Sequence, residues 1–196
     1  AAIGEGAANG LSHAHGVCDE VGQRLNIVHR DVSPHNLMLS RTGEVKVMDF
    51  GIAKAEVRAT KTSTGTIKGK VAYMAPEHAG GGSVDKRSDQ FSLGAVLWEA
   101  LTGERLFVGD SELELLRNVI ACSTRDLRAL RADVPAELVG IVERAICSDP
   151  AGRYDDLKEM ARDLAHFRFS YGPQASGLPR NAARSLSDPI SQQASR

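Results

Sequence analysis

Long hydrophobic runs, clustered cysteines and a strong net charge are all missing from this sequence, and each absence excludes a class of protein. No apolar run approaches the roughly 20 residues of a membrane-spanning helix, so no membrane segment is predicted. The first residues lack a basic segment followed by an apolar one, so no signal peptide is predicted either. The formal net charge of −1 gives no reason to expect nucleic acid or an acidic membrane as a partner.

The three cysteines, Cys18, Cys122 and Cys147, lie far apart and form no CxxC pair. Such a scattered, odd-numbered set is typical of reduced thiols in a cytosol-like compartment, so we expect a cytoplasmic domain without a zinc site. A longer protein could still anchor this domain to a membrane through segments outside this chain. At 196 residues, 42% of them hydrophobic, the chain is long enough for one domain with a core of its own. It also lacks an initiator methionine, which indicates a fragment or a processed piece.

Hydrophobic spacing predicts a mainly helical domain with a small β hairpin. Apolar residues at helical spacing predict a helix over about 1–17, and two short β-rich runs at 37–39 and 45–48, separated by a Thr-Gly turn, predict the hairpin. The nearly continuous apolar run 91–101 predicts a helix that is buried on all sides at the centre of the core. Further helices are predicted over 111–120, 135–147 and 155–167.

Two stretches lack any such pattern. Residues 55–69 show no hydrophobic periodicity and are rich in threonine, which predicts a long exposed loop of the kind that is usually functional or mobile. After residue 169 the chain turns to Ser, Ala, Pro and Gly, a composition that cannot bury enough surface to offset its ordering entropy. We therefore predict a domain over 1–169 and a disordered linker over 170–196.

Three short motifs carry the chemistry, and they follow one another along the chain: His29-Arg30-Asp31 with Asn36, then Asp49-Phe50-Gly51, then Ala75-Pro76-Glu77. In this order and spacing they resemble the HRD…N catalytic loop, the metal-binding DFG motif and the APE motif of protein kinases. Each triplet alone would be weak, but here all three occur in register, and the resemblance runs from about residue 11 to residue 167. The chain therefore resembles the helical large lobe of a protein kinase, without the small β lobe. The runs "HRDVSPHN" and "KGKVAYMAPE" look like those of the eukaryotic-like serine/threonine kinases of bacteria.

The resemblance implies phosphoryl transfer from ATP to a serine or threonine hydroxyl of a protein substrate. Asp31 would orient that hydroxyl and accept its proton, while Asn36 and Asp49 offer the hard oxygen ligands that Mg²⁺ prefers. Met38 would lie on the floor of the nucleotide pocket. The alternative, that these are ordinary turn-forming residues, explains none of the spacing.

Other matched residues are expected to be architectural: His29, Phe50, Gly51, Glu77, Asp89 and Arg153. By resemblance, His29 and Phe50 belong to the packed spine that crosses active kinases, and a metal-ligand role for His29 is the weaker alternative. Glu77 and Arg153 resemble a buried ion pair, and removing one partner of such a pair costs roughly 3–5 kcal/mol. Asp89 resembles the residue that hydrogen-bonds the catalytic-loop backbone from the start of the central helix.

Arg30 and the threonine-rich loop predict control by phosphorylation. In kinases with this arrangement the Arg beside the catalytic Asp pairs with a phosphate on the activation loop, and Thr66, with Thr64 near it, matches the usual position of that phosphate. A phosphothreonine adds about −1.5 to −2 charge and three acceptor oxygens, enough to order a loop against an Arg. An activating kinase or self-phosphorylation in trans would supply the phosphate. The alternative is a loop that is merely polar.

Two positions depart from the family's pattern. The lysine that the family carries two residues after the catalytic Asp is Ser33 here, and the threonine of a later loop is Lys70 here. We interpret this as an exchange in which Lys70 bonds the Ser33 hydroxyl and supplies the missing positive charge. The alternative is a weakened or inactive site in which Lys70 is one more surface cation. His35 stands where many basophilic kinases have an acid, which weakens any expectation of basic substrates.

The small lobe that binds ATP in members of this family cannot be recognised in the sequence. Its Gly-rich loop, strand lysine and helix glutamate need far more chain than the 28 residues that precede His29. The glycine-containing run 3–10 resembles such a loop weakly and is better interpreted as the start of the helix before the catalytic loop. We therefore expect the isolated chain to be inactive.

Three other functions are weaker alternatives. A pseudokinase or a truncated lobe acting as a binding module is the main one, and a small-molecule phosphotransferase a lesser one. Tyrosine kinase activity is disfavoured because the catalytic loop lacks the Ala/Arg pattern of tyrosine kinases.

Overall fold

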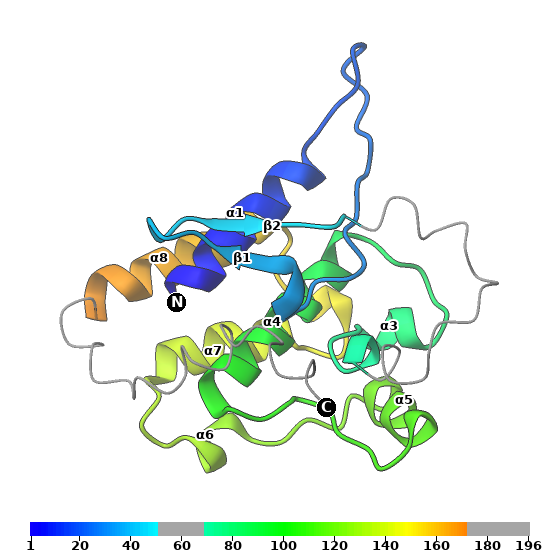
Figure 1. The fold of residues 1–196 in the computed structure, drawn as a ribbon, viewed down its shortest axis with the longest axis vertical. Helices are drawn as coiled ribbons and strands as arrows, with labels where there is room; N and C mark the ends of the chain where they lie inside the picture. Colours follow the sequence, from blue (N-terminus) through cyan, green and yellow to red (C-terminus); the bar gives the residue numbers. More distant parts are fainter. Residues whose placement is uncertain (51–68, 172–196) are drawn as a thin grey trace, which may run out of the picture.

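The computed structural model describes residues 1–50 and 69–171. Within these ranges the chain is mainly helical, and its two short strands form one antiparallel sheet (Figure 1). The first helix lies beside the last, and the sheet packs against the first helix. The predicted fold class, a helical core with a small β hairpin, is confirmed.

Helix α1 (Ala2–His15) contains the glycine-rich run at the start of the chain. A Cβ added to Gly4 would come within 2.9 Å of Leu97 Cδ2. One added to Gly6 would come within 2.8 Å of Val45 Cβ. These glycines therefore allow α1 to pack closely against its neighbours, and the run is a helix and not a phosphate-binding loop, as the sequence predicts.

The segment between α1 and the catalytic loop projects from the body as a narrow excursion (Figure 1). An isolated bridge between Cys18 and Arg24 closes it. The β-rich pair Ile27-Val28 forms no strand, and the chain continues without regular structure to the short 3-10 helix η1 (Pro34–Asn36).

Strands β1 (Leu37–Leu39) and β2 (Val45–Val47) follow η1 directly and pair in antiparallel register. The turn between them uses Gly43, whose φ of 86° lies in the left-handed region that favours glycine. The predicted hairpin is confirmed, with the second strand ending one residue before Met48.

Helix α4 (Lys86–Thr102) forms the centre of the core. All its residues from 88 to 98 are buried, which confirms the helix predicted to be buried on all sides. It begins before the apolar run because the Asp85 side chain caps it, accepting a hydrogen bond from Arg87 N at 2.7 Å. It ends at Gly103, whose φ of 76° is left-handed.

Helix α7 (Ala136–Ala145) packs closely against α4 because Gly94 has no side chain. A Cβ at this position would come within 2.7 Å of Ile146 Cγ2 and within 2.9 Å of Ala145 Cβ. A larger residue at position 94 would therefore push the two helices apart.

The remaining elements are α3 (Pro76–Ala79), α5 (Glu112–Ile120), α6 (Leu127–Leu130), the 3-10 helix η3 (Pro150–Gly152) and α8 (Leu157–Tyr171). Helix α8 continues past the predicted domain end at residue 169. The Tyr171 ring stacks on the Phe167 ring one turn earlier, with centroids 4.7 Å apart, and this contact extends the helix. In the described ranges, no helix is both long enough and apolar enough to cross a bilayer.

Candidate active site

The catalytic loop is anchored to the core by Asp89, a fully buried residue in the first turn of α4. Its Oδ1 accepts a hydrogen bond from Arg30 N at 2.9 Å, and its Oδ2 accepts one from His29 N at 2.8 Å. Oδ2 also accepts a hydrogen bond from His15 Nε2 at 2.8 Å. Three donors compensate the burial of this carboxylate and fix the start of the loop against the core.

The backbone of the site is strained at two residues. Arg30 has a φ of 65° and Asp49 a φ of 55°, in the left-handed region that residues other than glycine rarely adopt. Such a conformation costs of order 1–3 kcal/mol and persists only where the surroundings impose it. The buried Asp89 carboxylate imposes it at Arg30 through the hydrogen bond to the Arg30 N–H.

His29 links the catalytic loop to the segment that carries Asp49. The side chain is fully buried, its Nε2 donates to the Met48 carbonyl at 2.8 Å, and its Nδ1 accepts a hydrogen bond from Asp31 N at 3.2 Å. Its ring also packs on Phe50, with centroids 4.6 Å apart. Because both ring nitrogens are engaged, the geometry favours the architectural role over a metal-ligand role for His29.

Asn36 and Asp49 enter and leave the hairpin at the same end. The Asn36 carbonyl accepts a hydrogen bond from Met48 N at 2.8 Å, and the Asn36 side chain donates from Nδ2 to the Asp31 carbonyl at 2.7 Å. The side-chain oxygen of Asn36 makes no hydrogen bond to any residue that the structure describes, and the carboxylate of Asp49, the residue after Met48, is exposed.

This pair of oxygen donors suits Mg²⁺, which is commonly held by one or two protein side chains together with substrate phosphates. Within the described part of the chain, no group of three or more His, Cys, Asp or Glu side chains could hold a metal without such help. The residues present thus fit a metal that arrives with a phosphorylated substrate.

Lys70 contacts the catalytic loop at Asp31 and not at Ser33. Its Nζ lies 2.7 Å from Asp31 Oδ2, and the expected hydrogen bond to the Ser33 hydroxyl is not formed between these two described residues. A carboxylate attracts an ammonium more strongly than a neutral hydroxyl does, which accounts for the difference. Ser33 itself is buried, with 7% of its surface exposed.

Glu77 and Arg153 join the Ala-Pro-Glu motif to the core. The Arg153 guanidinium is buried and donates to both Glu77 oxygens, at 2.8 and 2.9 Å. Its remaining hydrogen bonds go to the carbonyl oxygens of Cys147, Arg87 and Ser148. Burial alone would raise the pKa of Glu77, but the hydrogen bonds from Arg153 and Ser88 outweigh it and hold that pKa below its ordinary value.

Three predicted residues, Gly51, Thr64 and Thr66, lie outside the described residues. Arg30, the predicted phosphate partner, is exposed beside Asp31. Met38, predicted on the floor of the nucleotide pocket, lies in β1 with 58% of its surface exposed.

Sequence reasoning missed two residues that support the site. The first is His15, which hydrogen-bonds Asp89 and follows Leu11 at helical spacing on the buried side of α1. A polar residue within an apolar stripe is the sequence signal that indicates such a buried contact. Tyr73 donates to Glu99 Oε2 at 2.5 Å, and burial together with this carboxylate raises the pKa of the Tyr73 hydroxyl. No sequence pattern pairs these two residues, which are 26 positions apart.

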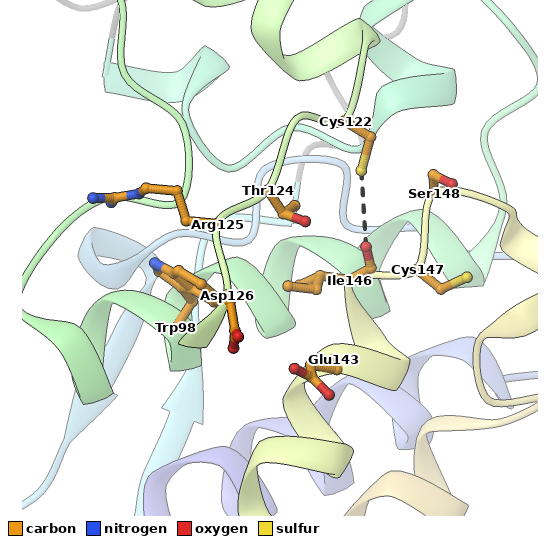
Figure 2. A pocket seen from close by; sticks show the side chains of 9 residues that line it. All are labelled: Trp98, Cys122, Thr124, Arg125, Asp126, Glu143, Ile146, Cys147 and Ser148. Carbon is orange, nitrogen blue, oxygen red and sulfur yellow. Dashed lines mark hydrogen bonds between the residues drawn. The ribbon is translucent and has the colours of Figure 1, made fainter. Parts of the chain in front are cut away.

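A separate cavity of about 430 Å³ lies between α4, the segment 122–126 and the end of α7 (Figure 2). None of the predicted site residues lines it. Cys122 and Cys147 do, and Figure 2 shows their side chains pointing in different directions, with the Cys122 thiol toward the Ile146 carbonyl. Burial raises the pKa of the Cys122 thiol.

Comparison with known proteins agrees with this geometry. Residues 6–166 match the protein kinase domain. The chain is 45% identical over 176 residues to the tyrosine-protein kinase MasK of Myxococcus xanthus (strain DK1622), a match that covers 90% of this chain and 27% of that protein. It is 39% identical over 176 residues to the serine/threonine-protein kinase PknB of Mycolicibacterium smegmatis, covering 89% of this chain and 27% of PknB. It is 36% identical over 162 residues to the serine/threonine-protein kinase PrkC of Bacillus subtilis, covering 83% of this chain and 24% of PrkC.

The chain spans about a quarter of the length of these relatives. Its match to the kinase domain nevertheless extends over most of its own residues and includes both the catalytic loop and the buried ion pair. The chain therefore belongs to the protein kinase family, among the eukaryotic-like kinases of bacteria.

Proposed function

We propose that the protein carrying this chain transfers the terminal phosphoryl group of ATP to serine and threonine hydroxyls of other proteins. The observation that carries this proposal is the linkage of three site residues through Asn36. Its side chain donates to the Asp31 carbonyl, and its own carbonyl accepts from Met48 N, one residue before Asp49. These two bonds tie the backbone of the catalytic loop to the backbone beside Asp49, and this supports the fixed relation between an acidic side chain and two oxygen ligands that phosphoryl transfer requires.

ATP with Mg²⁺, when bound, supplies the transferable phosphoryl group and neutralises the charge on its oxygens. Asn36 and Asp49 would hold the metal through their side-chain oxygens, and Met38 would form the floor under the nucleotide. Asp31 orients the acceptor hydroxyl, and its carboxylate accepts the proton that the hydroxyl loses as the new oxygen–phosphorus bond forms.

Serine and threonine are favoured over tyrosine as acceptors. The catalytic loop lacks the Ala/Arg pattern of tyrosine kinases, and the relatives PknB and PrkC are named serine/threonine kinases. Tyrosine remains the second candidate, because MasK, at 45% identity, is named a tyrosine kinase.

Control by phosphorylation is part of the proposal. Arg30 is exposed beside Asp31, where a phosphate on Thr66, or on Thr64 near it, could pair with the guanidinium. An activating kinase, or a second copy of the protein acting in trans, would add that phosphate.

The 196 residues alone are proposed to be inactive, because the family's Gly-rich loop and strand lysine cannot be recognised in them. A non-catalytic binding module is the alternative for the isolated chain. The three cysteines are free thiols, which agrees with a cytoplasmic location, where ATP is available.

The metal site gives a direct test of the proposed chemistry. We expect Asp49→Ala in the full-length protein to lower phosphate transfer by about 10²-fold or more, because it removes a ligand of the ion that neutralises the phosphate charge. The measurement is transfer of radiolabelled phosphate from ATP to a generic protein substrate during a Mg²⁺ titration. Glu44→Ala, an exposed carboxylate in the turn of the same hairpin, is the control and should leave transfer within two-fold of wild type. Equal transfer by Asp49→Ala and wild type, or transfer that needs no divalent metal, would contradict the proposal.

A further inference from the structure

The described active site contains carboxylates, and phosphoryl transfer adds negative charge to it. Asp31 and Asp49 are the acidic groups of the site, and the phosphoryl oxygens of a nucleotide would lie near both. A site of this kind needs a fixed cation from the protein in addition to the metal, since a preorganised positive charge is worth more there than in water. Position 33, two residues after Asp31, carries a buried serine and so supplies none.

The structure brings a cation to the site from a different segment. Lys70, 39 residues farther along the chain, has its Nζ 2.7 Å from Asp31 Oδ2. The Asp31 side chain is only 13% exposed, whereas that of Lys70 is 44% exposed. The ammonium thus lies over the atom that the proposed chemistry uses, at the open side of the site.

The backbone of Lys70 is fixed by packing and not by this ion pair. The next three residues, Val71, Ala72 and Tyr73, are 7%, 1% and 5% exposed. The turn is closed by a hydrogen bond from Met74 N to the Val71 carbonyl at 3.1 Å, and the Tyr73 hydroxyl ties it to Glu99 of α4. An ordinary surface lysine has no such support, and an exposed ion pair by itself would contribute little.

We propose that Lys70 is a catalytic residue that supplies the positive charge on the transferred phosphoryl group in place of a lysine at position 33. The proposal rests on the proposed kinase function and adds the source of the cation. In the step itself the bond from phosphorus to the leaving ADP oxygen breaks and the bond to the acceptor oxygen forms. The acceptor's proton goes to Asp31, while Lys70 exchanges no proton and neutralises charge on the phosphoryl oxygens.

Because the cation is Lys70, catalysis depends on the conformation of the segment that follows the threonine-rich loop. A lysine at position 33 would belong to the catalytic loop and be present whenever that loop is formed. Lys70 is present only when the turn over residues 70–74 is packed against Asp31 and α4. When that turn is ordered, Lys70 therefore supplies the positive charge that balances the carboxylates and phosphoryl oxygens of the active site.

The activity test compares Lys70→Thr, Lys70→Arg and the double variant Ser33→Lys/Lys70→Thr in the full-length protein. We expect Lys70→Thr to lower kcat by about 10²–10³-fold with little change in the KM for ATP, because the charge acts on the transition state. Lys70→Arg keeps the charge and should retain at least a tenth of the activity. The double variant should recover at least ten-fold over Lys70→Thr.

Lys46→Thr is the matched control, because Lys46 is an exposed lysine of β2 with a single long ion pair to Glu44 at 3.8 Å. It should leave kcat unchanged. Because Ser33 is buried, the double variant can fail to fold, and in that case the comparison of Lys70→Thr with Lys70→Arg decides.

A second readout needs no activity. Acylation of lysine amines, followed by mass spectrometry of the ligand-free protein, should modify Lys70 more slowly than Lys46, and Asp31→Asn should remove that difference. ATP with Mg²⁺ should protect Lys70 further.

The outcomes separate this proposal from the kinase proposal. If wild type transfers phosphate and Lys70→Thr retains more than a third of its kcat, the role of Lys70 is overturned while the kinase function stands. Equal losses in Lys70→Thr and Lys70→Arg would overturn it as well, because charge would then not be what matters. If wild type transfers no phosphate, the proposed function itself fails.

Discussion

Replacing Asp31 by Asn is expected to slow phosphate transfer by about 10²–10⁴-fold, the range that a general acid or base contributes. Asparagine has nearly the same size and keeps the backbone carbonyl that the Asn36 side chain uses, so the loop should keep its shape. It cannot accept the proton of the acceptor hydroxyl. The loss should therefore appear in kcat, measured by single-turnover transfer in the full-length protein, while the affinity for ATP changes little.

Asp133→Asn is the control for this substitution. Asp133 is also a carboxylate in an ion pair, with Arg131 at 2.7 Å, but its side chain is exposed and its partner is not a predicted site residue. Removing its charge should leave transfer unchanged. Comparable rates for Asp31→Asn and Asp133→Asn would show that Asp31 has no catalytic role.

Arg153→Met is expected to lower the free energy of unfolding by about 3–5 kcal/mol, the usual cost of removing one partner of a buried ion pair. The guanidinium is fully buried, so methionine would replace its volume but none of its hydrogen bonds. Glu77 would keep only the Ser88 hydroxyl as a side-chain partner, and three backbone carbonyls would lose their donor. Chemical denaturation of wild type and variant at neutral pH measures the difference.

The Glu77–Arg153 pair also predicts how the free energy of unfolding depends on pH. The pKa of Glu77 in the folded protein lies below its ordinary value of 4.5, so the ionised carboxylate stabilises the fold above that pH. This contribution is lost as the pH falls through the lower, folded-state pKa. The gap in stability between wild type and Arg153→Met should therefore narrow below pH 4.5.

Arg125→Met is the matched control for Arg153→Met, because the Arg125–Glu104 pair is exposed on both sides. Such pairs contribute about 0–1 kcal/mol. If Arg153→Met costs no more than Arg125→Met, the Glu77–Arg153 pair does not hold the Ala-Pro-Glu segment to the core.

Local sequence patterns predict the helices and the hairpin well. The apolar run 91–101 can only be a buried element, and α4 is that element. The boundaries were less accurate, because they depend on single contacts that no periodicity reveals. The Asp85 cap starts α4 early, and the stacking of Tyr171 on Phe167 carries α8 past its predicted end at residue 167.

Motif spacing likewise predicts which residues belong to the site but not which atoms meet. Asp31, Asn36 and Asp49 follow from the order of the motifs. The order of the motifs does not predict the partner of Lys70. A long, flexible side chain selects between the Ser33 hydroxyl and the Asp31 carboxylate only once the chain has folded and both groups are in place. The contact between His15 and Asp89, 74 positions apart, depends on how α1 crosses the core and has no signature of its own.

The chemical identity of the phosphorylated residues tests the proposed activity most directly. Full-length protein is incubated with ATP, Mg²⁺ and a protein substrate, and the phosphorylation sites are assigned by mass spectrometry in wild type and in Asp31→Asn. The predicted result is phosphoserine and phosphothreonine, formed by wild type and reduced at least about 10²-fold in Asp31→Asn. Phosphate found only on tyrosine, or formed equally by both proteins, would contradict the assignment of a serine/threonine kinase that acts through Asp31.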